Sequence, residues 1–249
     1  MPDGWQATPG GAVPRGWEVD AVVHRYVDRL PEFRSLAEGT GPVAVPLTPA
    51  VTVGANAVDQ NTLLVLAHAL LWAARGRDGV AVLDWGGGFG YASFAARALL
   101  PDDVVLGYTC IDLPTIMDAA RPIVPEVRFV DEDCAFASRY DLTMSSSAMQ
   151  YAVDWPGLVA RLAAATDRYL LLTDVPFVLH APSFVVLQRT QTHGIDTEYL
   201  GWVLNRQELV GTVEATGLHL VREYALGFRP RVHAAPERPR TGAFLFGVG

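Results

Sequence analysis

The residues most able to do chemistry follow a short apolar run in the first half of the chain. Residues 82–90 read Val-Leu-Asp-Trp-Gly-Gly-Gly-Phe-Gly, so a carboxylate precedes glycines at alternate positions. Glycine permits positive φ and removes the side chains that would keep a ligand away from the backbone. Open α/β sheets bind their ligands at the carboxyl ends of such strands. We therefore expect Asp84 to lie beside a binding loop formed by Gly86, Gly87, Gly88 and Gly90.

The spacing of these glycines argues against a nicotinamide-binding loop. That fingerprint requires Gly-x-Gly-x-x-Gly, and its third position falls here on Tyr91 or, in the next register, on Ser93. An acidic residue ahead of the glycines also suits a cationic ligand better than a pyrophosphate. The loop therefore favours a positively charged ligand over NAD, and a glycine-rich turn that binds nothing is the alternative.

Polar residues also follow the next three predicted strands. Asp112 ends the second strand, where a carboxylate can accept hydrogen bonds from both hydroxyls of a ribose. Asp133 follows the third strand, with Asp131 as a second candidate, and Ser145 and Ser146 follow the fourth. The alternatives are an acid in the first turn of a helix for Asp112 and a solvated acidic loop for Asp133.

These segments resemble the class I S-adenosylmethionine (SAM) dependent methyltransferases, whose motif I reads Asp-x-Gly-x-Gly-x-Gly, as residues 84–90 do. Residues 83–87, 146–151 and the surroundings of Gln188 are also similar to a family of bacterial methyltransferases. That family carries Leu-Asp-Phe-Gly-Gly, Ser-Ser-x-Leu-Gln-Tyr and a glutamine in a long insert. The resemblance spans residues 80–224 and implies that SAM is the cofactor.

The resemblance also implies which residues hold the cofactor, including an acid after the third strand for the adenine amino group. These residues are Asp84, Gly86, Gly87, Gly88, Gly90, Asp112, Leu113, Asp133, Cys134, Ser145 and Ser146. The chain departs from the narrower family after the fifth strand, where Asp-Arg-Thr-Pro is expected and residues 173–176 read Thr-Asp-Val-Pro. Any substrate contact of that arginine cannot be carried over to this chain.

The acceptor site is predicted in a long insert over residues 175–205. His180 and His193 are the candidates for a general base, which is needed only if the acceptor must lose a proton. The residues predicted to bind the acceptor are Gln150, Tyr151, Gln188, Tyr199 and Trp202. Loop histidines bonded to backbone, and packing roles for Tyr199 and Trp202, are the alternatives. No metal is expected, because the fourth strand ends without the carboxylates that a hard cation requires.

We predict an α/β fold with a Rossmann-like, mostly parallel seven-stranded sheet, an antiparallel terminal hairpin strand and a small N-terminal helical cap. The arm and cap take residues 1–78, and the SAM-binding methyltransferase domain takes residues 79–249. Two cap helices, which either only cover the sheet or also form one wall of the substrate pocket, are expected at 17–36 (ended by Pro31 or soon after) and 59–75. The predicted strands are 80–83, 104–111, 127–131, 141–145, 168–174, 219–227 and 242–248, and the helices between them are 91–100, 114–121, 155–166 and 205–217.

Composition excludes several function classes. The chain has 249 residues, half of them hydrophobic, a net charge of −8 and 19 basic residues, all of them arginine. Without lysine there is no Schiff-base enzyme, pyridoxal-phosphate site or P-loop. The chain shows no basic stripe for nucleic acid, no membrane span and no leader peptide. We expect a cytoplasmic protein with a small-molecule substrate, for which a homodimer is an option.

The function that these observations favour is methyl transfer from SAM to an oxygen or nitrogen of a small molecule, by in-line displacement. The donor is already activated, so the protein has mainly to align the reacting atoms and exclude water. Two alternatives share the fold: a SAM-dependent reaction such as a cyclisation, and a non-catalytic SAM-binding or scaffold protein. The complete set of glycines, together with Asp84 and Asp112, argues against the scaffold.

Overall fold

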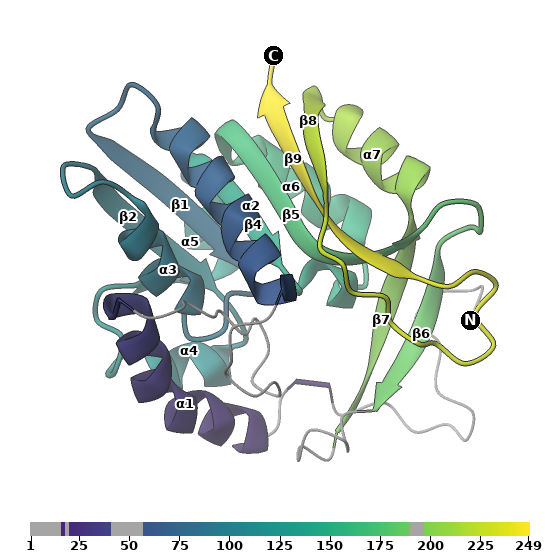
Figure 1. The fold of residues 1–249 in the computed structure, drawn as a ribbon, viewed down its shortest axis with the longest axis horizontal. Helices are drawn as coiled ribbons and strands as arrows, with labels where there is room; N and C mark the ends of the chain where they lie inside the picture. The colour runs from purple at the N-terminus through teal and green to yellow at the C-terminus, as the bar shows by residue number, and fades with distance from the viewer. Residues whose placement is uncertain (1–15, 18–19, 41–56, 190–196) are drawn as a thin grey trace.

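The computed structural model describes residues 16–17, 20–40, 57–189 and 197–249. These residues form a mostly parallel sheet with helices against both of its faces (Figure 1). The predicted α/β, Rossmann-like architecture is confirmed. No helix in the described ranges is long and apolar enough to cross a lipid bilayer.

The first half of the sheet alternates strands and helices, as the sequence predicts. Its strands are β1 (Gly79–Trp85), β2 (Val105–Ile111), β3 (Arg128–Phe129), β4 (Tyr140–Ser146) and β5 (Thr166–Val178). Between them lie α3 (Tyr91–Leu99), α4 (Pro114–Ala120), α5 (Glu132–Phe136), the 3-10 turn η1 (Met149–Tyr151) and α6 (Trp155–Ala164). The order β3-β2-β1-β4-β5 is parallel throughout. The polar residues that follow these strands therefore meet at one edge of the sheet.

The second half contains two strands that the sequence did not predict. The long insert forms an antiparallel hairpin of β6 (Phe184–Arg189) and β7 (Glu198–Asn205). It is followed by α7 (Arg206–Glu214), β8 (Leu218–Ala225) and β9 (Arg240–Val248). Because β9 lies antiparallel between β5 and β8, the antiparallel terminal hairpin is confirmed. The sheet has nine strands in place of the predicted seven.

The length of β5 explains how the hairpin is attached. The first part of β5 pairs with β4 and ends at the pair Ser146–Thr173. Beyond the end of β4, Phe177 and Val178 pair in parallel with the end of β7. The hairpin is therefore fixed just past the edge at which β4 ends (Figure 1).

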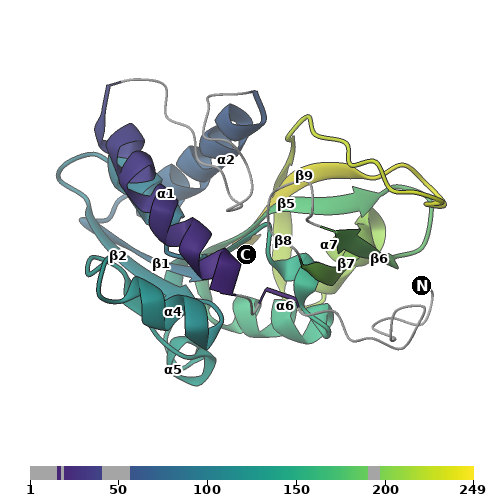
Figure 2. The ribbon, with the colours of Figure 1, turned by 90° about the horizontal axis from the view of Figure 1, so that it is seen from below.

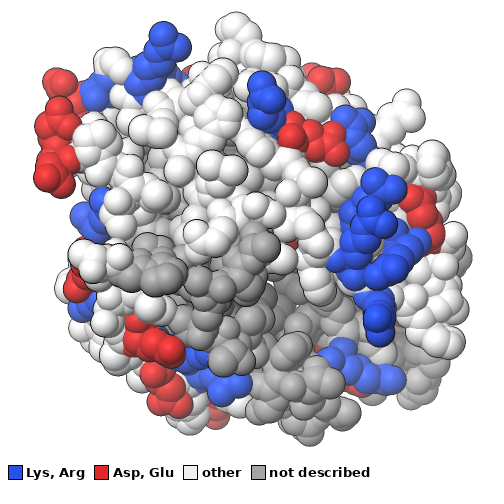
Figure 3. All heavy atoms as spheres, viewed as in Figure 1, with Lys and Arg blue, Asp and Glu red and all other residues white. Residues whose placement is uncertain are grey.

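The two cap helices are α1 (Asp20–Glu38) and α2 (Ala57–Ala74). The first lies close to the predicted range 17–36, but it continues through Pro31 to Glu38, because Phe33 and Ala37 beyond the proline are buried against the domain. Figure 2 shows α2 on one side of the sheet and α6 on the other. The outward face of α2, where Figure 3 shows few charged atoms, exposes Leu64 and Trp72.

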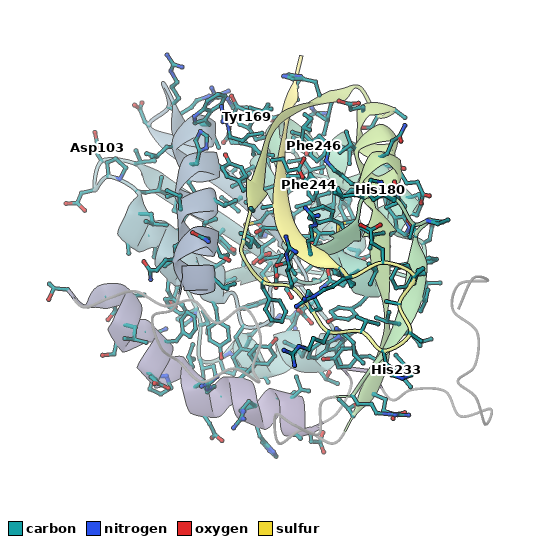
Figure 4. The ribbon with its side chains drawn as sticks, turned by 45° about the vertical axis from the view of Figure 1, so that its right-hand side comes forward. Asp103, Tyr169, His180, His233, Phe244 and Phe246 are labelled. Carbon is teal, nitrogen blue, oxygen red and sulfur yellow. The ribbon has the colours of Figure 1, made fainter. Side chains whose placement is uncertain are left out.

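Alternate strand residues face two separate hydrophobic cores. Val82 and Leu245 belong to the core that α1 to α4 cover, whereas Leu83 and Phe246 belong to the core under α5, α6 and α7. Figure 4 shows Phe244 and Phe246 together on β9. Burial on both faces explains why these strands read as continuous apolar runs.

Replacing Pro31 by alanine is expected to stabilise the protein. Pro31 is exposed inside α1 and supplies no N–H to the helix, a defect worth up to about 3 kcal/mol. Urea unfolding should show a free energy of unfolding higher by roughly 1–2 kcal/mol. Pro156→Ala is the matched control, because Pro156 lies in the first turn of α6, where the N–H has no intrahelical partner. An equal gain in both variants would contradict the explanation.

Candidate functional site

A cavity of about 710 Å³ opens at the carboxyl ends of β1, β2 and β4. Its walls come from the turn after β1, the starts of α4 and α5, η1 and the N-terminal segment. Among its lining residues are Trp17, Tyr26, Trp85, Gly86, Asp112, Leu113, Asp131, Glu132, Ser146, Ser147 and Tyr151. The structure thus brings together six of the residues that the sequence singled out, which are Gly86, Asp112, Leu113, Asp131, Ser146 and Tyr151.

The glycine turn after β1 is held against the end of β2. Gly86 adopts a φ of 76° and its N–H donates to the Ile111 carbonyl at 2.7 Å. A Cβ atom at Gly86 would lie 2.2 Å from the Cβ of Ala148, so no larger residue fits. Gly90, with a φ of 71°, caps the N-terminus of α3.

Asp112 joins this turn to the cavity. Its Oδ2 accepts from the Gly88 N–H and its Oδ1 from the Leu113 N–H, both at 2.7 Å. Each oxygen keeps a further lone pair, and the side chain lines the cavity. The pKa of Asp112 lies above its ordinary value, because the effect of burial exceeds the lowering effect of the two backbone hydrogen bonds. The carboxylate is therefore fixed in place and can still accept hydrogen bonds from a ligand.

Asp84 lies behind the turn and does not line the cavity. A Cβ atom at Gly87 would lie 2.2 Å from its Oδ2, so only glycine allows this carboxylate to stand there. The Tyr108 hydroxyl donates to the same oxygen at 2.7 Å, and Oδ1 has no hydrogen-bond partner among the described residues. Burial, reinforced by the charge of Asp112, raises the pKa of Asp84 to about 7 against the lowering effect of Tyr108.

The acidic residues after β3 cap or belong to the short helix α5, and only some of them face the cavity. Asp131 lines the cavity and caps α5 by accepting from the Cys134 N–H at 2.8 Å. Glu132 also lines the cavity, where it accepts from Trp85 Nε1 at 2.9 Å. Asp133 and Cys134 are exposed on α5 and lie outside the lining. Of the two predicted adenine acids, the structure places Asp131 in the cavity.

Polar atoms without hydrogen-bond partners gather where the pairing of β4 with β5 ends. The side-chain oxygens of Ser145, Ser146 and Thr173, and Oε1 of Gln150, are buried without a hydrogen-bond partner in the described part of the chain. Of these residues only Ser146 lines the cavity. Buried polar groups of this kind are normally satisfied by a ligand or by water, which marks this end of the cavity as a polar binding region.

The predicted acceptor residues of the insert lie behind this end of the cavity. The Tyr151 hydroxyl donates to Gln188 Oε1 at 2.9 Å, and the Tyr199 ring meets the Tyr151 ring edge-on at 5.1 Å. Trp202 Nε1 donates to the Ala152 carbonyl at 3.2 Å. These three insert residues, Gln188, Tyr199 and Trp202, support the wall without lining it.

His180, the described histidine of the insert, does not line the cavity. His180 is exposed, and its backbone N–H donates to Glu237 at 2.7 Å. Figure 4 shows its side chain on the side of the molecule that the hairpin occupies. His193 lies outside the described residues. No histidine is found among the described residues of the lining.

The N-terminal segment supplies two aromatic residues of the cavity wall that were not predicted from the sequence. Tyr26 of α1 stacks on Phe89 at 5.0 Å, and Trp17 stacks on Tyr199 at 4.4 Å. Next to Trp17, the backbone of Gly16 exchanges hydrogen bonds with Glu198 and Thr197. Both aromatic residues line the cavity, so the cap does more than cover the sheet.

Solved structures share this architecture. SAM-bound CalS10, an amino pentose methyltransferase from Micromonospora echinaspora involved in calicheamicin biosynthesis, has a TM-score of 0.51 at 15% identity and covers 79% of this chain and 93% of that one. The N-terminal domain of EvdMO1 with S-adenosylhomocysteine (SAH) bound has a TM-score of 0.50 at 14% identity, with coverages of 79% and 83%. The chain has the class I methyltransferase fold. No family model and no curated protein matches its sequence.

The raised pKa of Asp84 predicts how stability depends on pH. With the pKa moved from 3.8 to about 7, the folded protein keeps a proton that the unfolded chain loses, so stability falls as the pH rises across this interval. Asp84→Asn removes the titration. Its effect on the free energy of unfolding should be more favourable at pH 8 than at pH 4, by about 1 kcal/mol or more.

Chemical unfolding of the unliganded protein at both pH values measures this difference. Asp118→Asn is the control, because Asp118 is exposed on α4. An Asp84→Asn effect that is independent of pH would show that Asp84 is ionised in the folded protein throughout.

Proposed function

We propose that the protein is a SAM-dependent methyltransferase that acts on an oxygen or nitrogen of a small molecule. The observation that carries this proposal is the carboxylate of Asp112. It lines a cavity at the carboxyl edge of a parallel sheet and is held by the glycine turn beside it. Support also comes from the CalS10 and EvdMO1 structures, which share the fold and contain SAM and SAH.

The cavity offers a suitable environment for each part of the cofactor. The two oxygens of Asp112 can accept from the ribose hydroxyls, and Asp131 stands where an adenine amino group would be met. Apolar side chains of the lining, such as Leu113 and Met117, are suited to contact the adenine ring. The unpartnered oxygen of Ser146 lies at the other end, toward the methionine part. A volume of about 710 Å³ is typical of small-molecule sites.

The charges of the lining match a cationic donor. Its described residues include Asp112, Asp131 and Glu132, the last paired with Arg161 outside the lining, and no arginine or histidine. SAM carries a sulfonium and an ammonium group, whereas NAD carries two phosphates. Methyl transfer then requires mainly alignment of nucleophile, methyl carbon and sulfur, an orientation effect worth up to about 7–11 kcal/mol.

The cofactor assignment predicts the effect of Asp112→Ala on SAH binding. Loss of a charged acceptor for the ribose hydroxyls should weaken binding by roughly 1.5–3 kcal/mol, or about tenfold to a hundredfold. Isothermal titration calorimetry with SAH measures this, with NAD as a second ligand that should not bind.

Asp118→Ala is the matched control, an exposed carboxylate of the adjacent α4 that lies outside the lining. Equal SAH affinity in the parent and in Asp112→Ala would disprove the ribose assignment. A folded parent protein that binds no SAH would favour a non-catalytic scaffold.

A further inference from the structure

Two strained residues lie on neighbouring strands, at the point where the pairing of β4 with β5 ends. Ser147, just after β4, has a φ of 54°, and Asp174, within β5, has a φ of 53°. The Ser147 N–H donates to the Thr173 carbonyl at 2.9 Å, which ties the two positions together. Left-handed backbone at residues other than glycine is costly and tends to persist at functional sites.

A β-bulge produces the conformation of Asp174. On the β9 side, Leu172 pairs with Phe244 and Val175 with Gly242, so two residues of β5 face the single residue between them on β9. A bulge of this kind redirects a side chain from its regular position in a strand. Asp174 occupies the position where the family resembled by the sequence carries arginine.

The surroundings of Asp174 contain hydroxyl groups and no counter-ion. Burial raises the pKa of Asp174, and the nearby Ser147 hydroxyl lowers it. Burial raises the pKa of Tyr151, on η1, and the charges of Tyr199 and Asp174 add to this effect. The Tyr199 ring of β7 meets the Tyr151 ring edge-on. None of the ion pairs formed by described residues includes Asp174.

Ser147 connects this carboxylate to the cavity. Ser147 lines the cavity, whereas Asp174 is not among the lining residues. The unpartnered oxygen of Ser146 is adjacent. The carboxylates on the opposite wall already bind elsewhere: Asp112 accepts two backbone N–H groups, and Glu132 accepts from Trp85.

We propose that Ser147 and Asp174 form the proton-receiving pair for the methyl acceptor, with Ser147 in contact with the acceptor and Asp174 acting through it. This inference rests on the proposed methyltransferase function and narrows it to acceptors whose nucleophile carries a proton, such as a hydroxyl or an amine. As the nucleophile attacks, its bond to the methyl carbon forms and the carbon–sulfur bond breaks, with the electron pair going to sulfur to give SAH. The nucleophile's proton passes to Ser147 Oγ, whose own proton passes to the Asp174 carboxylate.

Sinefungin tests this inference without knowledge of the acceptor. It is an SAH analogue that carries a protonated amine in place of the transferred methyl group, so its amine would donate to the pair. The quantity to measure is the ratio of sinefungin to SAH affinity, by calorimetry, in the parent protein, Asp174→Asn and Ser147→Ala. We expect Asp174→Asn to lower this ratio roughly tenfold or more, with SAH affinity nearly unchanged. Ser147→Ala should lower the ratio at least as much, because it removes the group through which Asp174 acts.

The pH dependence separates this role from a purely structural one. In the parent protein the ratio should fall as the pH is lowered through the pKa of Asp174, because the carboxylate loses its charge. In Asp174→Asn this contribution to the pH dependence should be absent. Asp84 and Asp112, whose pKa values are also raised, are present in both proteins, so the difference between parent and variant isolates Asp174. The neighbouring phenols of Tyr151 and Tyr199 stay neutral in this range, since burial raises the pKa of both.

Each outcome decides between the two proposals. If SAH binds and the ratio is the same in the parent protein and in Asp174→Asn, the proton-receiving pair is wrong and the proposed function stands. If the folded parent protein does not bind SAH, the proposed function fails and the pair fails with it. Should Asp174→Asn not fold, an unchanged ratio in Ser147→Ala would overturn the inference.

Discussion

The structure of the site depends on one close approach, between the turn after β1 and the end of β2. Two hydrogen bonds hold it, from the Gly86 N–H to Ile111 and from the Gly88 N–H to Asp112. A side chain at Gly87 would prevent the approach, because its Cβ atom would lie 2.8 Å from the sulfur of Cys110 in β2. The same contact orients the Asp112 carboxylate in the cavity wall. Backbone geometry and ligand chemistry are therefore fixed by the same few atoms.

Much of the sheet and of the cavity could be predicted from the sequence, because both depend on patterns among residues that are close together in the chain. Apolar runs gave the parallel strands, and alternating glycines gave the turn after β1. Parallel strands end at a common edge, which explains why Asp112, Leu113, Ser146 and Tyr151 were expected together and lie in one cavity. The antiparallel end of the sheet followed from two strands without a helix between them.

The remaining features depend on contacts between distant segments. Tyr26 reaches the cavity only because α1 packs on Phe89, and nothing local to Tyr26 indicates this partner. The bulge that turns Asp174 toward Ser147 arises from pairing with β9. How deeply a side chain is buried also depends on contacts between distant segments. Asp84 lies near the end of β1 and Asp112 just after β2, yet of the two only Asp112 lines the cavity.

The contact of Gly16 with Thr197 and Glu198 has a consequence for the order of folding. The residues joined by the Thr197–Gly16 hydrogen bond are 181 positions apart. Closing so long a loop carries an entropic cost that only the later packing of Trp17 on Tyr199 offsets. During synthesis the chain's beginning leaves the ribosome long before β7 exists. The aromatic wall near Tyr199 is thus completed late, by the segment that was made first.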